Sequence, residues 1–181
     1  ASVSDVSFDE DASGSTSLSA SDVDGDDLTF SISGGSDITA SLSGADISFS
    51  APADYNGSET FTITVTDGNL SDSQSITVTV DAVNDAPVAN ATSATTSEDQ
   101  SVVVTLSGSD IDGDALTFSL ATDATNGSVT LDGSFATYTP DANFNGDDSF
   151  SFSVSDSSDS SSASVSLSVS AVNDAPVLAS V

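Results

Sequence analysis

The sequence of 181 residues contains no lysine, arginine, histidine, cysteine, methionine or tryptophan. Without Lys or Arg no side chain can pair with phosphate, which excludes nucleic acid and an anionic membrane surface as partners. Without Cys there is neither a disulfide nor a thiolate metal site. Without His, Cys or Lys, general-base and nucleophilic chemistry lacks its usual groups. We therefore expect a protein that is not an enzyme.

Long apolar segments are missing as well. No run approaches the length of a transmembrane helix, so we expect no direct membrane insertion. The chain also shows no signal peptide, which favours a mature protein or an internal fragment of a secreted one. We expect an extracellular or cell-surface location.

What the sequence has in excess is carboxylate. Its 29 Asp and Glu residues give a formal charge of −29, and only three of them are Glu. Disorder is one interpretation of such a charge, but 36% of the residues are hydrophobic and they alternate regularly. Asp favours turns and metal-binding loops over helices. We therefore expect the carboxylates to bind a divalent cation.

The chain repeats itself. Val83-Asn84-Asp85-Ala86-Pro87-Val88 recurs as Val172-Asn173-Asp174-Ala175-Pro176-Val177, 89 positions later. Repetition at a fixed period predicts an array of similar modules. We expect one repeat over residues 1–83, a linker with a second repeat over 84–172, and the start of a further linker over 173–181.

Short alternating segments indicate the fold class. Leu28-Thr29-Phe30-Ser31-Ile32 and Leu116-Thr117-Phe118-Ser119-Leu120 are apolar at every second position, as in strands with one buried face. Turn signals separate such segments, and none has a helical period. The pattern predicts two all-β Greek-key sandwiches. The expected strands lie near 3–8, 15–20, 28–32, 37–42, 46–51, 60–66 and 74–81, and near 91–96, 101–106, 115–120, 127–131, 134–139, 149–155 and 163–170.

The aromatic residues fit this core. Phe30, Phe61, Phe118, Phe150 and Phe152 are predicted to be buried. Tyr55 and Phe144 are expected to cover the end of the core after the fifth strand of each repeat, and sugar stacking is a weaker alternative for Tyr55.

Strand reversals predict which acidic turns meet. In a seven-stranded Greek key, the turns after the first and fifth strands lie at the end where the chain leaves. The turns after the second and sixth strands lie where it enters. The acidic turns of the two repeats should therefore face each other at the linker and bind Ca²⁺, which prefers oxygen ligands. The predicted ligands at this joint are Glu10, Asp11, Asp54, Asn84, Asp85, Asp110, Asp112, Asp114 and Asp156.

Half-sites are expected at the two outer ends. Neighbouring repeats, or copies packed end to end or laterally in a fibre, would complete them. One comprises Asp22, Asp24, Asp26 and Asp67, and the other Glu98, Asp141, Asn143, Asn173 and Asp174. Four further carboxylates, Asp72, Asp123, Asp132 and Asp159, are interpreted as solubility charges without convergent partners.

These motifs resemble the cadherin domain, and more closely the bacterial cadherin-like repeats of large secreted adhesins. Ser21-Asp22-Val23-Asp24 and Ser109-Asp110-Ile111-Asp112 resemble the family's Asp-x-Asp turn, Asp67 and Asp156 its single-Asp turn, and Asn84-Asp85-Ala86-Pro87 its linker. The resemblance covers nearly the whole chain and implies an Ig-like fold with Ca²⁺ between successive domains. Ala86 replaces the family's linker Asn, and Asp54 and Asn56 replace its Glu, so one or two ions per joint are expected.

Alternatives to this interpretation remain at several points. The Asp-x-Asp-Gly-Asp run lacks the later Glu and the helices of an EF-hand, although a solvated turn without an ion stays possible. The favoured function is a calcium-stiffened structural spacer of an adhesin or surface fibre. A module that binds carbohydrate or protein through the divergent segments 34–44 and 122–133 is a second possibility, and a self-assembling filament subunit is a third.

Overall fold

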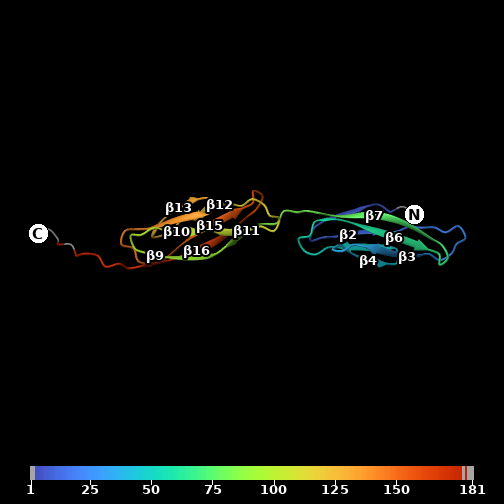
Figure 1. Ribbon diagram of the computed structural model, residues 1–181, viewed down its shortest axis with the longest axis horizontal. Helices are drawn as coiled ribbons and strands as arrows, with labels where there is room; N and C mark the ends of the chain where they lie inside the picture. The colour runs from blue at the N-terminus through green and yellow to red at the C-terminus, as the bar shows by residue number, and fades with distance from the viewer. Residues whose placement is uncertain (1–2, 177, 179–181) are drawn as a thin grey trace. The chain divides into compact units, whose positions relative to one another are not determined.

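The computed structural model describes residues 3–176 and 178, which form two compact units divided between Val83 and Asn84 (Figure 1). Each unit consists of β-strands arranged in two layers around its own apolar core. The expected all-β tandem sandwich is confirmed. Nowhere in the described ranges is there a helix with the length and apolar character needed to cross a membrane.

Unit 1, drawn in blue to green in Figure 1, has the seven expected strands. One sheet has the order β1-β7-β6-β3 and the other the order β2-β5-β4. All neighbours are antiparallel except β1 and β7, which run parallel. The strands are β1 Val6–Asp9, β2 Ser13–Ser17, β3 Thr29–Gly34, β4 Thr39–Ser43, β5 Asp46–Ser50, β6 Gly57–Thr66 and β7 Ser71–Asp81.

Unit 2 repeats this arrangement with two of its strands divided. Its sheets have the orders β9-β16-β15-β12 and β10-β14-β13, and a short pair β11-β8 lies beside them. The strands are β8 Val88–Asn90, β9 Thr92–Ser97, β10 Val102–Thr105, β11 Ser107–Ser109, β12 Thr117–Thr122, β13 Gly127–Asp132, β14 Phe135–Pro140, β15 Gly146–Ser155 and β16 Ser160–Ser170.

The strands predicted near 91–96 and 101–106 correspond to β9 and β10, whereas the short strands β8 and β11 were not predicted. The first strand of unit 2 changes partner at Ala91. Before it, β8 pairs antiparallel with β11, and after it, β9 pairs parallel with β16. Alternation along the sequence reports which face is buried, and it does not report a change of partner sheet.

Alternating burial explains why these segments form strands. In β5 the side chains of Ile47 and Phe49 are each 1% exposed, and the residues between them face outward. Phe49 packs edge-on against Phe61, with ring centroids 5.3 Å apart. Phe150 and Phe152 are buried as expected, and Phe30 and Phe118 pack half-buried against the same cores. Tyr55 and Phe144 also contact the cores of their units.

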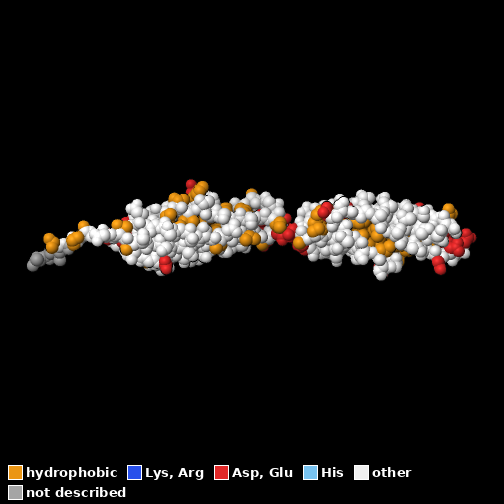
Figure 2. Space-filling view, turned by 60° about the horizontal axis from the view of Figure 1, so that its bottom comes forward, with side chains coloured by type: hydrophobic (Ala, Val, Ile, Leu, Met, Phe, Trp, Pro, Cys, Tyr) orange, Lys and Arg blue, Asp and Glu red, His pale blue; other side chains and the backbone are white. Residues whose placement is uncertain are grey.

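Backbone hydrogen bonds place the acidic turns at the ends of each sandwich. The Glu10 N–H donates to the Asp81 carbonyl (2.9 Å), and the Glu98 N–H donates to the Ser170 carbonyl (2.9 Å). The turn after the first strand therefore lies where the last strand ends, as the count of reversals predicts. On the face shown in Figure 2, carboxylate side chains gather mainly at the ends of the sandwiches.

One carboxylate in each unit binds the loop after the third strand. Both oxygens of Glu59 accept backbone N–H groups, from Ser36, Asp37 and Ile38, at 2.9–3.1 Å. Asp148 does the same in unit 2 with Thr125 and Asn126 (3.1 and 2.9 Å).

The hydrogen bonds of these two carboxylates shift their pKa values. The backbone N–H groups of Asp37, Ser36 and Ile38 lower the pKa of Glu59 against a smaller opposing effect of burial. Burial raises the pKa of Asp148, but the N–H groups and the Tyr138 hydroxyl together lower it below its ordinary value. Burial, with the same hydrogen bond, raises the pKa of Tyr138.

We predict that these two carboxylates contribute to acid sensitivity. A lowered pKa in the folded state means that the ionised form stabilises the fold above the unfolded pKa, and that this contribution is lost as the pH falls through the folded pKa. Glu59→Gln and Asp148→Asn should therefore flatten the loss of stability below about pH 4.5. Urea unfolding between pH 7 and pH 3 measures this, with the exposed Asp132→Asn as control. Equal slopes for wild type and both variants would contradict the prediction.

Candidate metal site

Glu10 lies in the turn after β1 and is 5% exposed. Its Oε1 accepts the N–H of Val83, the last residue of unit 1 (2.6 Å). Its Oε2 is buried and has no hydrogen-bond partner. Burial of a polar atom without a hydrogen-bond partner costs free energy, so this oxygen is a candidate ligand for a cation.

Asp11 and Asp54 lie beside Glu10 at the same end of unit 1. Both have left-handed backbones, with φ of 59° and 57°, a conformation that Asp tolerates better than most residues. The Asp54 N–H donates to Oδ1 of Asp11 (3.3 Å), and a carboxylate oxygen of each lies within 4.8 Å of the other. The two turns are thereby held together with their carboxylates adjacent.

Unit 2 has the same arrangement at its C-terminal end. Glu98 is 5% exposed, and its carboxylate accepts the Val172 N–H and the Asn145 side-chain amide. Asp99 and Asn143 have φ of 63° and 58°, and the Asn143 N–H donates to Oδ1 of Asp99 (3.0 Å).

The loop Asp110–Asp114 forms a second kind of cluster at the N-terminal end of unit 2. Oδ1 of Asp110 accepts the Asp114 N–H (3.2 Å), and its Oδ2 is buried without a hydrogen-bond partner. Oxygens from Asp110, Asp112 and Asp114 all lie within 4.8 Å of one another. Gly113 permits the tight turn with a φ of 79°.

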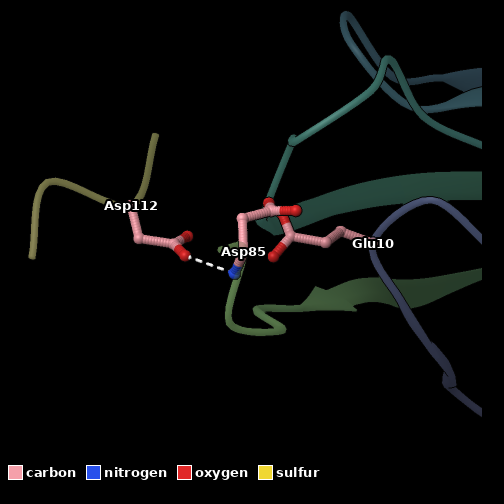
Figure 3. Close-up of side chains that lie close together, drawn as sticks. All are labelled: Glu10, Asp85 and Asp112. Carbon is pink, nitrogen blue, oxygen red and sulfur yellow. Dashed lines mark hydrogen bonds between the residues drawn. The ribbon is translucent and has the colours of Figure 1, made fainter. Parts of the chain in front are cut away.

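The linker residues bind to this end of unit 2. The Asp85 N–H donates to Oδ2 of Asp112 (2.8 Å; Figure 3). The Asn84 amide donates to Asp156 and Asp159, each at 3.1 Å. The backbone N–H of Asp159 lowers the pKa of Asp156, and burial opposes this shift. The Ser158 N–H and the Asn84 side-chain amide lower the pKa further. Asp156 is therefore ionised at neutral pH although it is 6% exposed.

The N-terminal end of unit 1 carries the matching turns. Oδ1 of Asp22 accepts the N–H groups of Asp24, Gly25 and Asp26 at 2.8–3.2 Å. Asp67 accepts the N–H groups of Leu70 and Asn69, which lower its pKa.

The predicted residues therefore gather within their own units. Glu10, Asp11 and Asp54 lie at one end of unit 1. Asn84, Asp85, Asp110, Asp112, Asp114 and Asp156 lie at one end of unit 2. Glu98 lies with the linker residue Val172, while Asp174 is exposed in the segment that follows. Whether these residues bind metal stays a prediction.

Sequence reasoning misjudged three carboxylates. Asp159, interpreted as a solubility charge, accepts the Asn84 amide, and Asp123 accepts the N–H groups of Ala124 and Val129. Asp99 was missed, although it stands next to Glu98 just as Asp11 stands next to Glu10. The correspondence of Asp99 with Asp11 at the repeat spacing could have identified it.

The ligand set fits a hard cation. Every candidate offers oxygen, and carboxylates with amide and backbone oxygens are the ligands that Ca²⁺ prefers. The buried, unpartnered oxygens of Glu10 and Asp110 are the atoms that such an ion would contact. Acidic clusters that could hold a metal are therefore present in the chain.

We predict that Asp99 has a structural role that can be separated from metal binding. Both variants lose the hydrogen bond to Asn143. Asp99→Ala keeps a Cβ at positive φ, whereas Asp99→Gly has no Cβ and adopts this backbone conformation without steric cost. Asp99→Ala should therefore unfold more easily than Asp99→Gly, by about 1 kcal/mol. Chemical denaturation with chelator present measures the difference. Equal stability of the two variants would show that the turn is not strained.

Comparison with solved structures supports the fold. The chain is similar to human protocadherin-24 EC1-2, with 19% identity, a TM-score of 0.58, and coverage of 89% of this chain and 88% of the other. It is also similar to protocadherin gamma B7 extracellular cadherin domains 1-4, with 14% identity, a TM-score of 0.57, and coverage of 94% and 50%. These likenesses show a tandem cadherin-like sandwich.

A third similarity covers only part of a larger protein. An endo-fucoidan hydrolase of glycoside hydrolase family 107 shares 27% identity over 83% of this chain, with a TM-score of 0.42, and this chain spans 24% of that one. No curated protein matches the chain. The family model for the bacterial Ig domain matches residues 1–79 and again 84–168. The chain therefore belongs to the bacterial Ig domain family, of which it contains two tandem domains.

Proposed function

We propose that the chain consists of calcium-stiffened spacer repeats of a long extracellular adhesin or surface fibre. The observation that carries this proposal is the pair of buried oxygens, on Glu10 and Asp110, that have no hydrogen-bond partner. The chain has no cationic side chain that could serve them. An external cation could serve them, and Ca²⁺ is an abundant extracellular ion with this ligand preference.

The covalent linker supports a role at the joint. Glu10 binds the N–H of Val83, and the next two residues, Asn84 and Asp85, bind Asp156 and Asp112. No spacer residue separates the two sets of contacts. An ion that took ligands from both sides of this linker would restrict rotation at the joint. Without the ion, carboxylate repulsion would favour a flexible joint.

The proposed role is mechanical and does not include catalysis. The bacterial Ig domain family and the cadherin-like fold favour an extracellular domain. The carboxylates of the two units lie in corresponding turns, as repeated joints require. Rigidity and reach follow from such joints when repeats are added in tandem.

We predict that Ca²⁺ stabilises the folded chain. Extracellular modules bind Ca²⁺ with a Kd of about 10⁻⁴ to 10⁻³ M. An ion that binds only the folded state adds about 2.7 kcal/mol at a hundredfold excess over Kd. The melting temperature should therefore rise with Ca²⁺ and fall with chelator. Scanning calorimetry at constant ionic strength measures both changes.

Matched variants separate a specific site from charge screening. Asp112→Ala removes a carboxylate of the Asp110–Asp114 cluster, whereas Asp132→Ala removes an exposed one at the end of β13. Asp112→Ala should lose much of the gain in melting temperature, and Asp132→Ala should keep it. An equal response of the two variants, or the same gain from NaCl, would overturn the proposed calcium site.

A further inference from the structure

Three asparagines in the chain are followed directly by glycine: Asn56, Asn126 and Asn145. Asparagine is a labile residue, because the backbone nitrogen of the next residue can attack Cγ of its side-chain amide. A side chain on that next residue crowds the approach, and glycine has none. Each Asn-Gly pair is therefore a place where the chain can modify itself.

The reaction needs only water as a co-reactant. The glycine nitrogen forms a bond to Cγ of the asparagine, the bond from Cγ to the side-chain nitrogen breaks, and ammonia leaves with the proton of the glycine nitrogen. Water then opens the resulting succinimide ring. Its attack at Cγ gives aspartate, and its attack at the backbone carbonyl carbon gives isoaspartate. One water is consumed and one ammonia is released, so a neutral amide becomes a carboxylate.

The structure leaves room for this reaction at Asn145. Asn145 and Gly146 are both exposed, and Gly146 is the first residue of β15, at a strand end where local opening is easiest. The φ of Gly146 is 133°, a conformation that favours glycine. A Cβ placed on Gly146 would meet nothing nearer than the Phe144 ring, at 3.7 Å. The surroundings of Gly146 are therefore open enough for the ring to close.

Asn126 is instead held in place. Its N–H donates to Oδ2 of Asp148 (2.9 Å), and its carbonyl accepts the Asp141 N–H (2.9 Å) and the Tyr138 hydroxyl (3.3 Å). Ring closure turns the backbone carbonyl of the asparagine, so these hydrogen bonds must break first. A Cβ on Gly127 would lie 2.6 Å from the Tyr138 ring. The folded structure therefore protects this pair.

Asn56 lies between these two cases. It is exposed, but Gly57 is half-buried, and a Cβ there would lie 2.9 Å from the Tyr55 hydroxyl oxygen. The three dipeptides are identical in sequence, and only their surroundings differ. The structure thus ranks Asn145 as the most reactive, Asn56 as the next and Asn126 as the least.

We propose that Asn145 deamidates spontaneously in the folded protein, ahead of Asn56 and Asn126. The change affects a buried group, because the Asn145 side-chain amide donates to Oε2 of Glu98 (3.4 Å), which is 5% exposed. A carboxylate at this position cannot donate that hydrogen bond, and it sets a second acidic group against Glu98. Deamidation should therefore destabilise unit 2 when no cation is present.

The new carboxylate also changes what this end of unit 2 can bind. It lies beside Glu98, and carboxylate oxygens are ligands that Ca²⁺ prefers. The modified chain should therefore depend more strongly on Ca²⁺ than the unmodified chain. This consequence rests on the proposed calcium-dependent function, whereas the deamidation itself does not.

Time-resolved NMR of the 181-residue chain, in chelator at mildly alkaline pH, tests the proposal. The side-chain NH₂ signal of each asparagine disappears as its amide is lost, and the masses of chymotryptic peptides identify each product. The signal of Asn145 should decay first and that of Asn126 last. In urea the three should decay at similar rates, and folding should slow Asn126 by about tenfold or more, because it waits for local opening. A stable Asn145, or any other order in the folded chain, would refute the proposal.

Two variants test the consequence separately from the reaction. Asn145→Asp reproduces one product, and Asn145→Ser removes the same amide without adding a carboxylate. In chelator Asn145→Asp should melt at a lower temperature than Asn145→Ser, and Ca²⁺ should narrow this difference. Equal melting in chelator would show that the new carboxylate does not act on Glu98. A difference that Ca²⁺ leaves unchanged would count against the calcium proposal alone, since the decay of the Asn145 signal is measured without Ca²⁺.

Discussion

A protein with 29 carboxylates and no cationic side chain has only a few ways to stabilise them. Backbone N–H groups are the most frequent partners in this structure. Glu59 and Asp148 bind the loops after the third strands, and Asp22, Asp67 and Asp156 close their own turns in the same way. For Glu59, Asp67, Asp148 and Asp156, such hydrogen bonds favour the ionised form and lower the pKa. The negative charge of these four groups is thus part of the fold, and it remains in place at neutral pH.

Glu10 and Asp110 mark the limit of this arrangement. Each uses one oxygen for a backbone N–H and buries the other without a partner. A buried polar atom without a partner is costly, and the proposed Ca²⁺ would supply a partner for each of these oxygens. Glu10 binds the N–H of Val83, and Asp110 lies in the loop whose Asp112 binds the N–H of Asp85. An ion held by either residue, as proposed, would act near the linker and leave the core of each sandwich unchanged.

Much of this could be predicted from the sequence, because alternation and repetition are local signals. The strands that contain Phe61 and Phe152 alternate regularly, and the position of Glu10 follows from counting strand reversals. The short strand β8 before Ala91 was not predicted, since only its pairing with β11 distinguishes it from the linker and the sequence does not report that partner. The contact between Asp159 and the Asn84 amide was missed for a similar reason: it joins residues 75 positions apart across a turn.

Carboxyl-carbon NMR of the chain during a Ca²⁺ titration tests the central claim most directly, because it observes each carboxylate separately. The account predicts that the side-chain signals of Glu10 and Asp110 shift with one shared midpoint, while that of the exposed Asp132 stays nearly unchanged. Small, uniform shifts of all Asp and Glu signals would show that Ca²⁺ only screens the surface, and would contradict it.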